Sequence, residues 1–499
     1  MDALRARLRH LCAEYGVEED RPDVMRAELV KRLDEDGWVE QWSRAQHESH
    51  HNPFERLQES THRLLEHIQA RGMIAGIGVI AAVAVVAIVV FWSNDDSPGP
   101  EPNANRYVID PDEMTNAHGV VKYCTGTDIA GQQRADVDAF NRLYKPKGLE
   151  MELVELHRNA DQELEKFTRY QRTGENACDV LYSDVIWTAY LVRNGWLFDL
   201  SRYFKERRQG DFVPTMLEAA TIGEKTWGIP KQADAGLLFY RRDRVGQAPT
   251  TWQALYEQAR TGRLRYQGLD YEGLTVNFLE IALAAGAEDI VTPEGKANIN
   301  QKPAREALQF MVDGVRHAAP YQVVVQSEDE NTAAFAKGRA DFMRNWLPYA
   351  KKVLDLNPRL AGKVAITRLP SWSGGGRGSI LGGHILVIPR LSENRGAALK
   401  AVDFLSSRKI VKRDATRFLL PPALSELWKD PDVQRVMPSV LKDAVFNATL
   451  RPRVSNYQDV SRAIYTNVNN ALRGDVEPEE ALDLANDQMN QALEASSPP

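Results

Sequence analysis

Two carboxylates close to the ends of predicted strands are the residues of this chain best suited to chemistry. Asp184 ends the apolar run at 179–184, and Asp128 follows the run at 120–124. Ligands bind at the carboxyl ends of strands in open α/β sheets, so Asp184 is expected to face a binding site. Such a carboxylate pair could cleave a glycosidic bond. It could equally accept hydrogen bonds from the hydroxyls of a bound sugar.

The sequence contains no motif of the other common catalytic classes. GxSxG, HExxH, GxxxxGK[ST] and a GxGxxG that follows a strand are all absent. The run SGGGRGS at 373–379 lacks the lysine of a phosphate-binding loop and is interpreted as a mobile loop. The histidine-rich run at 47–53 lacks spaced carboxylate or cysteine partners and is interpreted as a solvated loop. We therefore expect no metal, no cofactor and no enzyme, with a glycan-acting enzyme as the alternative.

The composition indicates a large protein that does not bind nucleic acid. The chain has 499 residues, of which 43% are hydrophobic and 26% are charged, with a net charge of -7. This length is ample for two or more packed cores. A mixed, mildly acidic charge argues against a nucleic-acid partner, which would require a basic face.

Strands and helices alternate over the larger part of the chain and would position the carboxylates. Apolar runs at 120–124, 149–156 and 179–184 predict strands, and helical patterns separate them. This alternation predicts an α/β fold with a parallel sheet covered by helices. Further helices are predicted at 251–261, 274–285, 303–317, 332–338 and 397–407, and the chain after residue 431 is almost all helical.

One segment, from Met73 to Trp92, is uniformly apolar. Its 20 residues, MIAGIGVIAAVAVVAIVVFW, carry no charge, which suits a membrane-spanning helix better than a buried core helix. Arg71 precedes it and two aspartates, Asp95 and Asp96, follow it, so the N-terminus is expected in the cytoplasm and the rest outside the cell. A cleaved signal peptide would begin near residue 1, so the segment is predicted to be a retained signal-anchor in the cell membrane.

The segments on either side of this anchor differ in character. Residues 1–72 are polar with helical periodicity, which predicts a small helical cytoplasmic segment. Residues 93–117 begin with a stretch rich in proline, glycine and acidic residues, which predicts an extended linker.

Six stretches of residues 118–495 form a recognisable series. The first two are DVIWTAYLVRNGWLFDLS at 184–201 and WGIPKQADAGLLFYRRD at 227–243. The others lie at 271–280, 342–350, 368–389 and 450–461. In this order the stretches resemble the family 1 extracellular solute-binding proteins of ABC importers, and within them the maltose/trehalose-type sugar-binding proteins.

The resemblance implies a two-lobed, periplasmic-binding-protein-like fold of type 2 with a hinge. Lobe 1 would comprise about 118–237 and 369–415, and lobe 2 about 238–368 and 416–495. The partners implied are a carbohydrate (a disaccharide, an oligosaccharide or a related polyol) and the permease subunits of an ABC importer. A membrane-anchored sugar sensor that signals to residues 1–72 is the alternative.

Ligand-binding residues follow from the resemblance position by position. Asp184 and Asp234 match acidic residues that accept hydrogen bonds from sugar hydroxyls, and Trp346 matches a stacking tryptophan. The other matched positions are Gly382, Gly383, Arg451 and, more loosely, Asp128; Tyr271 would support the stacking. An aromatic ring suits the apolar face of a sugar because it offers a large contact area with few rotamers to freeze.

Two positions depart from the family pattern. Gln232 stands where a tyrosine precedes the Asp234 position, and His384 stands where a tryptophan follows the glycine pair. Both can still hydrogen-bond a hydroxyl, but the loss of two aromatic rings leaves the sugar undefined. An inserted Leu347 could also tilt the region of Trp346.

Cys124 and Cys178 lie at the end of one predicted strand and the beginning of another. If these strands are parallel neighbours, as the family fold implies, the two thiols lie at opposite ends of the sheet, roughly 15 Å apart. A disulfide is therefore not expected on distance, although an oxidising compartment would favour one.

Overall fold

The computed structural model describes residues 108–157, 159–207 and 212–495, which belong to one compact unit, Asn103–Pro499. The predicted cytoplasmic segment, the predicted anchor at 73–92 and most of the predicted linker lie outside the described residues. Within the described residues, no helix has both the length and the apolar character needed to span a membrane.

The first sheet has five strands in the order β2-β1-β3-β11-β6. Strands β1 (Gly119–Thr125), β2 (Leu149–Glu155) and β3 (Val180–Asp184) are parallel, as their apolar runs predicted. Strand β11 (Leu381–Val387) runs antiparallel between β3 and β6 (Ile229–Ala235). The carboxyl end of β3 therefore lies beside a strand that comes from the far part of the chain.

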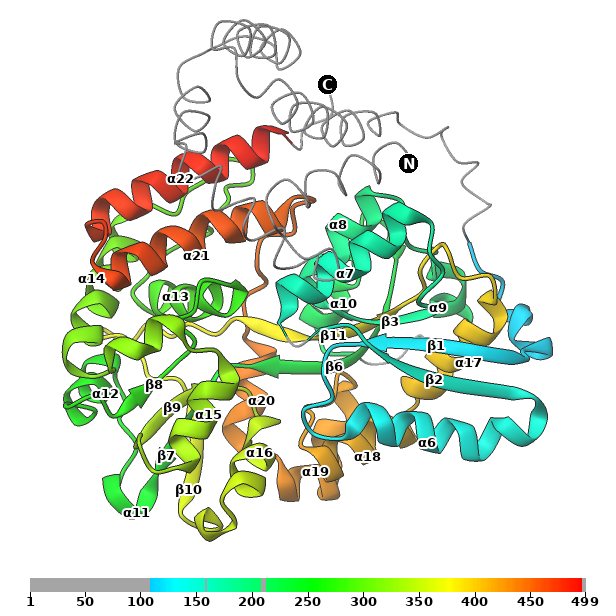
Figure 1. Cartoon of the computed structure of the whole chain (residues 1–499), viewed down its shortest axis with the longest axis horizontal. Helices are drawn as coiled ribbons and strands as arrows, with labels where there is room; N and C mark the ends of the chain where they lie inside the picture. The colour runs from blue at the N-terminus through cyan, green and yellow to red at the C-terminus, as the bar shows by residue number, and fades with distance from the viewer. Residues whose placement is uncertain (1–107, 158, 208–211, 496–499) are drawn as a thin grey trace, which may run out of the picture. The chain divides into compact units, whose positions relative to one another are not determined.

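Helices α6 (Gln132–Tyr144), α7 (Ala160–Thr173) and α17 (Arg395–Leu405) pack around this first sheet (Figure 1). The helix α7 begins at Asn159, whose side chain accepts hydrogen bonds from the backbone of the first turn, and buries one apolar face. Val121, Phe140 and Leu181 belong to the resulting core.

The second sheet has four strands in the order β10-β7-β9-β8. They are β7 (Leu237–Arg241), β8 (Leu264–Arg265), β9 (Phe342–Asn345) and β10 (Val364–Arg368). Strand β7 pairs antiparallel with both β9 and β10. A second hydrophobic core belongs to this sheet and its helices.

Helix α13 (Glu272–Ala284) lies at the centre of the second lobe. It packs against α14 (Lys302–His317) and α21 (Tyr457–Arg473), and α22 (Pro478–Ala495) packs against α21 (Figure 1). Nearly every residue of α13 is buried, which explains why it is hydrophobic all round.

The remaining α-helices and β-strands complete the two lobes. They are α8 (Thr188–Arg193), α9 (Ser201–Arg207), α10 (Pro214–Ala219), β4 (Thr221–Ile222), β5 (Lys225–Thr226), α11 (Arg242–Val245), α12 (Trp252–Gln258), α15 (Glu328–Ala336), α16 (Tyr349–Leu356), α18 (Arg408–Phe418), α19 (Pro431–Val436) and α20 (Ser439–Phe446). A short 3-10 helix, η4 (Val185–Trp187), follows β3.

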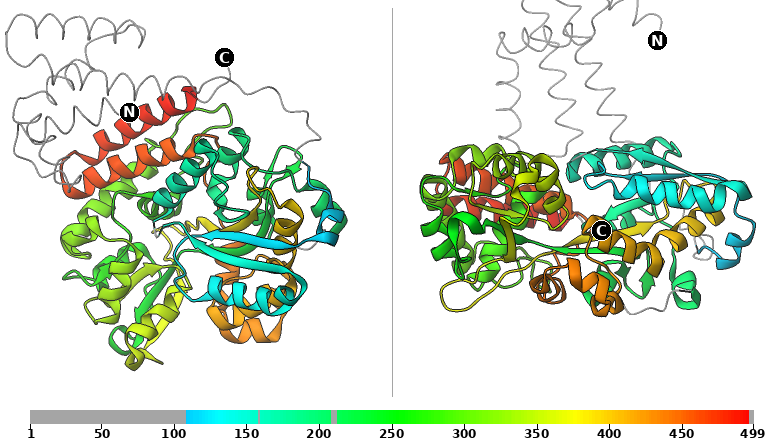
Figure 2. Two further views of the ribbon diagram at one scale, coloured as in Figure 1. Left: turned by 45° about the vertical axis from the view of Figure 1, so that its right-hand side comes forward. Right: turned by 90° about the horizontal axis from the view of Figure 1, so that it is seen from below.

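The chain passes between the two sheets three times, at Gly236, between β10 and β11, and after α20. Figure 2 shows the two groups of elements on either side of these passages. Gly236 is required at the first passage, because a Cβ there would lie 2.1 Å from Oε1 of Glu280 and 2.6 Å from Nη2 of Arg344. The predicted limits of the lobes stay a prediction. Buried side chains of α19 and α20, which lie in the range predicted for lobe 2, pack in the first core.

The glycine run at 373–379 lies against α13. A Cβ on Gly376 would lie 2.0 Å from the carbonyl oxygen of Ala284, and one on Gly378 would lie 1.9 Å from that of Glu280. These glycines therefore serve close backbone packing at the second passage.

Cys124 and Cys178 form a disulfide, with their Cα atoms 5.6 Å apart, so the expectation of no bridge is wrong. The register gives the reason. Tyr123 of β1 pairs with Val180, so β3 begins beside the end of β1 and its first residues face Cys124. The distance estimate assumed that the two strands start at the same level, and they do not.

Candidate functional site

Asp184 occupies the turn that ends β3, as its place after an apolar strand predicted. Its Oδ1 accepts a hydrogen bond from the backbone N–H of Ile186 at 3.1 Å and thereby caps η4. The guanidinium of Arg451 lies 3.5 Å from the same oxygen. Burial raises the pKa of Asp184, while Arg451 and the amide of Ile186 oppose this shift.

Arg451 joins the two lobes. Its Nη1 donates to Oε1 of Glu272 on the second lobe at 2.6 Å, and its Nη2 donates to the carbonyl oxygen of Leu381 at 3.1 Å and approaches Asp184 on the first lobe. Only 3% of the Arg451 side chain is exposed. Burial alone would lower the pKa of Arg451, but Asp184 and Glu272 raise it, so the arginine stays charged.

Glu272 is a site residue that the sequence did not reveal. It is the first residue of α13, and its carboxylate also accepts hydrogen bonds from Tyr457 at 2.7 Å and from Ser461. Burial raises the pKa of Glu272, and Arg451 opposes the shift. The stretch at 271–280 was singled out by resemblance, but its partners lie some 180 residues further along the chain.

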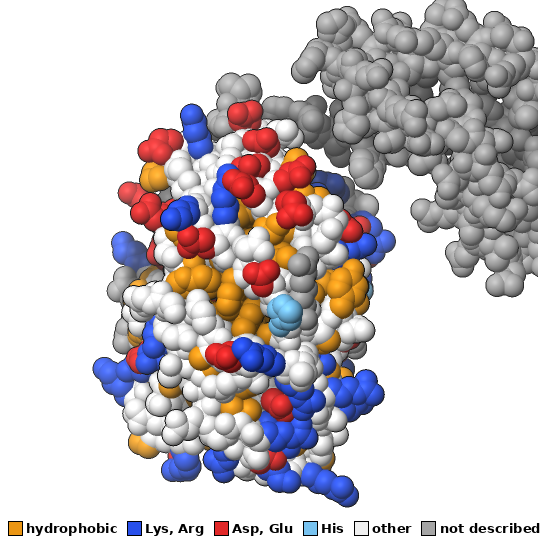
Figure 3. Space-filling model, turned by 90° about the vertical axis from the view of Figure 1, so that its left-hand side faces the viewer, with side chains coloured by type: hydrophobic (Ala, Val, Ile, Leu, Met, Phe, Trp, Pro, Cys, Tyr) orange, Lys and Arg blue, Asp and Glu red, His pale blue; other side chains and the backbone are white. Residues whose placement is uncertain are grey.

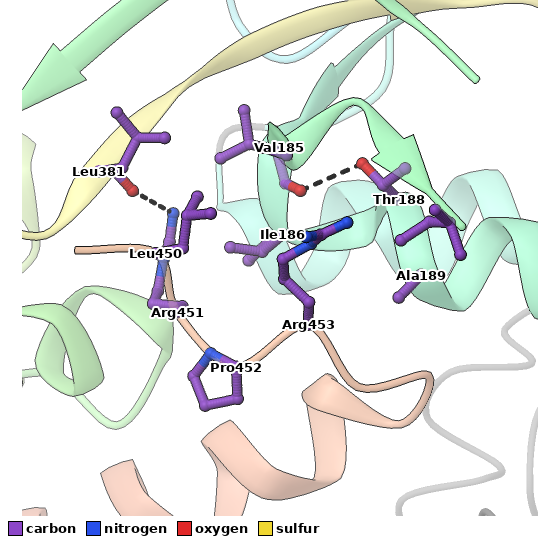
Figure 4. A pocket seen from close by; sticks show the side chains of 11 residues that line it. Val185, Ile186, Thr188, Ala189, Leu381, Leu450, Arg451, Pro452 and Arg453 are labelled. Atoms are coloured by element: carbon purple, nitrogen blue, oxygen red, sulfur yellow. Dashed lines mark hydrogen bonds between the residues drawn. The ribbon is translucent and has the colours of Figure 1, made fainter. Parts of the chain in front are cut away.

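A small hollow opens beside Arg451 (Figure 4). It is lined by the turn after β3, which contains Val185, and by the segment 450–453. Hydrogen bonds from Arg451 to Leu381 and from Thr188 to Val185 hold these walls. The hollow adjoins the predicted site, and its walls are mostly apolar.

Strand pairing brings three predicted residues into one row. His384 of β11 pairs with Asp184 of β3 on one side and with Gln232 of β6 on the other. Tyr182 donates a hydrogen bond from its hydroxyl to Oε1 of Gln232, and its ring stacks on the imidazole of His384 with centroids 4.1 Å apart. Gln232 and His384 therefore share Tyr182 as a support, which the sequence did not predict.

His384 has a ring nitrogen without a hydrogen-bond partner among the described residues. This nitrogen, Nδ1, is buried. Burial lowers the pKa of His384 to about 3, and the charge of Arg451 adds to the effect. The imidazole is therefore neutral at physiological pH, and each nitrogen can either donate or accept.

Gly382 and Gly383 let neighbouring groups approach the backbone of β11 closely. A Cβ on Gly382 would lie 2.9 Å from the indole of Trp346, and one on Gly383 would lie 2.3 Å from the carbonyl oxygen of Gln232. Gly383 also has a φ of +126°, which disfavours any other residue. The structure thus explains both glycines by packing, and the expected contact of their amides with a ligand stays a prediction.

Asp234 lies opposite Gly382 in the strand pairing and is 4% exposed. Its Oδ1 accepts a hydrogen bond from the backbone N–H of Ala235 at 2.9 Å. Burial raises the pKa of Asp234 to about 7, although Ala235 and Arg344 oppose the shift. Asp234 can therefore accept or donate a hydrogen bond near neutral pH.

Trp346 follows β9 and contributes an aromatic ring from the second lobe. The guanidinium of Arg344 lies 4.0 Å from the centroid of this ring and is held by Glu280, whose Oε2 accepts from Arg344 Nε at 2.8 Å. Trp346 Nε1 donates to Oε1 of Glu328 at 3.4 Å. The hydroxyl of Tyr271, another predicted site residue, donates to Oε2 of Glu328 at 2.5 Å. Trp346 and Tyr271 thus meet through a carboxylate that the sequence did not single out.

Asp128 is not joined to the other predicted residues by any hydrogen bond or ion pair between described residues. Its Oδ2 accepts from the backbone N–H of Arg134 at 2.9 Å, and its Oδ1 is buried without a partner. Glu163 of α7 is a second buried carboxylate near the sheet edge, 7% exposed, with an unpartnered Oε1. Burial raises the pKa of Glu163 well above its ordinary value, and Asp184 adds to the shift. Helix periodicity offered no signal for Glu163.

The described ranges also contain a hollow away from the site, and they contain no metal cluster. No group of three or more histidine, cysteine, aspartate or glutamate residues in the described ranges could hold a metal ion. The second hollow lies between α12 and α14, where Tyr256 stacks on Phe310 with centroids 4.0 Å apart. Figure 3 shows this end of the second lobe, with hydrophobic side chains across the middle of the face. None of the predicted site residues lines this hollow.

Two sheets joined by three passages, with polar and aromatic side chains from both meeting between them, define a two-lobed ligand-binding protein. The family model described as bacterial extracellular solute-binding protein matches residues 154–412. The chain is 30% identical over 361 residues to the "Probable ABC transporter-binding protein" of Deinococcus radiodurans. The aligned region covers 68% of this chain and 85% of that relative. The chain belongs to the bacterial extracellular solute-binding protein family.

Solved structures agree with this assignment. Maltose-bound MalE3 of T. maritima is 30% identical, with a TM-score of 0.70 over 74% of this chain and 98% of that one. The GacH receptor of Streptomyces glaucescens, solved unliganded and with acarbose, has a TM-score of 0.67 at 22% identity over 76% of this chain and all of that one, and so supports the fold alone. The predicted two-lobed α/β fold and the predicted family are confirmed. The family model and the Deinococcus relative are described as binding proteins, and neither description names an enzyme.

Proposed function

We propose that this chain binds a neutral carbohydrate or sugar alcohol between its two lobes and delivers it to the permease subunits of an ABC importer. The observation that carries the proposal is the meeting of a polar row on the first lobe, Asp184, His384 and Gln232, with the indole of Trp346 from the second lobe at Gly382. The likeness to maltose-bound MalE3 supports it, as do similar folds solved with ribitol and D-mannitol.

The side chains of the site match the two chemical faces of a sugar. Carboxylates, an amide and a neutral imidazole can accept and donate hydrogen bonds to hydroxyls, and those to ionised groups are the stronger. An indole offers a flat surface to the C–H face of the ring. The two substitutions Gln232 and His384 keep hydrogen-bonding capacity and remove aromatic area, which favours a ligand with more hydroxyl contacts and less stacking.

The charges of the site favour a neutral ligand over an anionic one. Arg451 is already paired with Glu272 and lies close to Asp184, and Arg344 is already paired with Glu280. Since these two arginines of the described site are already paired, a phosphate or carboxylate group on the ligand would meet Asp234 and other carboxylates there. Burying such an anion would be unfavourable.

The proposed place of action is the outer face of the cell membrane. The segment 73–92 would anchor the chain with residues 1–72 in the cytoplasm, as the charges around it predict. The disulfide between Cys124 and Cys178 supports an oxidising compartment for the two-lobed part.

Calorimetric titration of the full-length protein tests the proposal. The protein would be kept in a detergent without a sugar headgroup and titrated with maltose, maltotriose, trehalose, mannitol and glucose 6-phosphate. We expect binding of at least one neutral compound and none of the phosphorylated sugar. Silence across all the neutral compounds would contradict the proposal.

Replacement of Trp346 tests whether the sugar binds at this site. Trp346→Ala should weaken binding of the best neutral ligand by about 1–3 kcal/mol, because a buried aromatic anchor is lost. Trp196→Ala, which changes a partly buried tryptophan packed against the first core, serves as the control and should leave affinity unchanged. Unchanged affinity in Trp346→Ala would mean that the ligand lies elsewhere.

A further inference from the structure

Glu328 is the first residue of α15, and its carboxylate contacts both aromatic residues that are proposed to pack against the sugar. Its Oε2 accepts the hydroxyl hydrogen of Tyr271 at 2.5 Å, and its Oε1 accepts from Nε1 of Trp346 at 3.4 Å. Tyr271 is only 6% exposed. These three residues come from the start of α13, the start of α15 and the end of β9, so only the folded second lobe brings them together.

We propose that Glu328 is a positioning residue for sugar binding, which fixes the orientation of Trp346 and Tyr271 toward the ligand. The proposal rests on the proposed function, because it assigns a role within the same site. Glu328 acts through the two aromatic side chains, and contact of Glu328 itself with the sugar is not required.

Other contacts fix where the indole of Trp346 lies, and neither of them uses its nitrogen. Arg344 covers one face of the indole at 4.0 Å, and Gly382 makes room for its six-membered ring. The only hydrogen-bond donor of the indole is Nε1, so its bond to Glu328 adds a directed contact that holds this edge of the ring in place.

A carboxylate can serve both partners at once, since each oxygen of Glu328 accepts one hydrogen bond. A glutamine could replace it in part, because its carbonyl oxygen can accept from Nε1 of Trp346 while its N–H₂ group donates to the hydroxyl of Tyr271, which is also an acceptor. An alanine removes both bonds and leaves the hydroxyl of Tyr271 buried without this partner. The conservative change to glutamine should therefore be milder than the change to alanine.

The start of α15 is held firmly enough to present this carboxylate in one place. Ser327 and Glu330 form a capping box, and Asp329 makes an ion pair with Lys352 of α16. Neither of these contacts involves Tyr271 or Trp346. Asp329 therefore offers a matched control, since Asp329→Asn also removes a carboxylate from the first turn of the same helix.

The first experiment compares sugar affinities of the full-length variants by calorimetry, using the neutral ligand that the wild type binds best. Glu328→Ala should lose about tenfold in affinity, which corresponds to about 1.4 kcal/mol, the scale of one lost buried hydrogen bond, and Glu328→Gln should recover part of that loss. Asp329→Asn should stay close to the wild type. Wild-type affinity in Glu328→Ala, or an equal loss in Asp329→Asn, would overturn the proposal.

A double-mutant cycle separates positioning from a general loss of stability. Tyr271→Phe removes only the hydroxyl and should itself lose several-fold in affinity. If Glu328 acts through Tyr271, the double variant Glu328→Ala/Tyr271→Phe should lose no more than Glu328→Ala alone. Additive losses would overturn the proposal. If Glu328→Ala does not fold, an unchanged affinity in Tyr271→Phe would overturn it as well.

The proposed function and the role of Glu328 can be contradicted separately. A wild type that binds no neutral sugar contradicts the proposed function. A wild type that binds a sugar, with Glu328→Ala binding equally well, contradicts only the role of Glu328.

Discussion

Arg451 shows how one side chain can connect two lobes. It hydrogen-bonds Glu272 on the second lobe and lies 3.5 Å from Asp184 on the first, and it is almost completely buried. A buried ion pair contributes little net stability, but removing one partner is costly because it leaves an uncompensated charge. Here two carboxylates depend on the same cation.

We therefore expect Arg451→Met to destabilise the fold by about 3–5 kcal/mol. Methionine matches the length of the stem, so the loss reports the charge and its hydrogen bonds more than the packing. Arg453→Met is the control, since Arg453 forms an ion pair with Glu218 in which both side chains are at least one-third exposed. Its loss should stay below about 1 kcal/mol. Equal unfolding midpoints for the two variants in a urea titration would contradict the role of Arg451.

At the scale of residues, the sequence predicted a site carboxylate at the end of a strand better than site carboxylates at the starts of helices. Asp184 followed from an apolar strand that ends in a carboxylate. Glu272 and Glu328 did not, because each stands at the start of a helix, where an acidic residue is common for reasons of the helix dipole alone. Their roles depend on contacts with residues far away in sequence, such as Arg451 and Trp346.

At the scale of elements, the first turns of α7 and α13 form a contact between the lobes. Oδ2 of Asp161 accepts from the backbone N–H of Glu272 at 3.4 Å. Burial raises the pKa of Asp161 to about 7, and the carboxylates of Glu272 and Asp270 add to the shift. Arg462 opposes it, and Tyr465 is another titratable neighbour.

This contact predicts tighter sugar binding at acidic pH. If the lobes separate, Asp161 becomes solvated and its pKa falls toward 3.8. The proton therefore binds the closed form more tightly and stabilises it. That stabilisation is fully present below the open-state pKa and is lost as the pH rises through about 7.

Affinity measurements between pH 5 and pH 8 test this prediction. The wild type should bind the sugar more weakly at pH 8 and take up protons on binding, which titrations in two buffers of different ionisation enthalpy would reveal. Asp234 also has a pKa of about 7, so the comparison with Asp161→Asn is the decisive one. An identical pH profile in Asp161→Asn would rule out this contact as the source.

The elements themselves were largely predictable, and their pairing was not. The strands expected at 120–124, 149–156 and 179–184 became β1, β2 and β3 with nearly the same limits, because their apolar runs are short and bounded by helical patterns. Strand β11 inserts between β3 and β6 after a gap of almost two hundred residues, and no local pattern encodes that insertion. The wrong expectation for Cys124 and Cys178 has the same origin, since stagger between strands is a property of the sheet.

At the scale of the whole molecule, the family motifs predicted two lobes where periodicity alone predicted only an α/β fold. The motif stretches lie close to the passages between the sheets, including β6 with β7 and the segment that leads into β11. Those passages need special residues such as Gly236, which leaves a recognisable pattern in the sequence. The outer helices need only an apolar face, so they carry less information about the fold.

The membrane topology of the whole chain can be tested through its three cysteines. Cys124 and Cys178 are bridged, while Cys12 lies in the segment predicted to be cytoplasmic. In spheroplasts, a membrane-impermeant maleimide should leave the chain unlabelled, whereas a permeant maleimide should add one label, at Cys12. Impermeant reagent should add two labels once a reductant and a denaturant have opened the outer part without breaking the membrane. Labelling of Cys12 by the impermeant reagent in untreated spheroplasts would reverse the proposed orientation, because a charged maleimide cannot cross the bilayer.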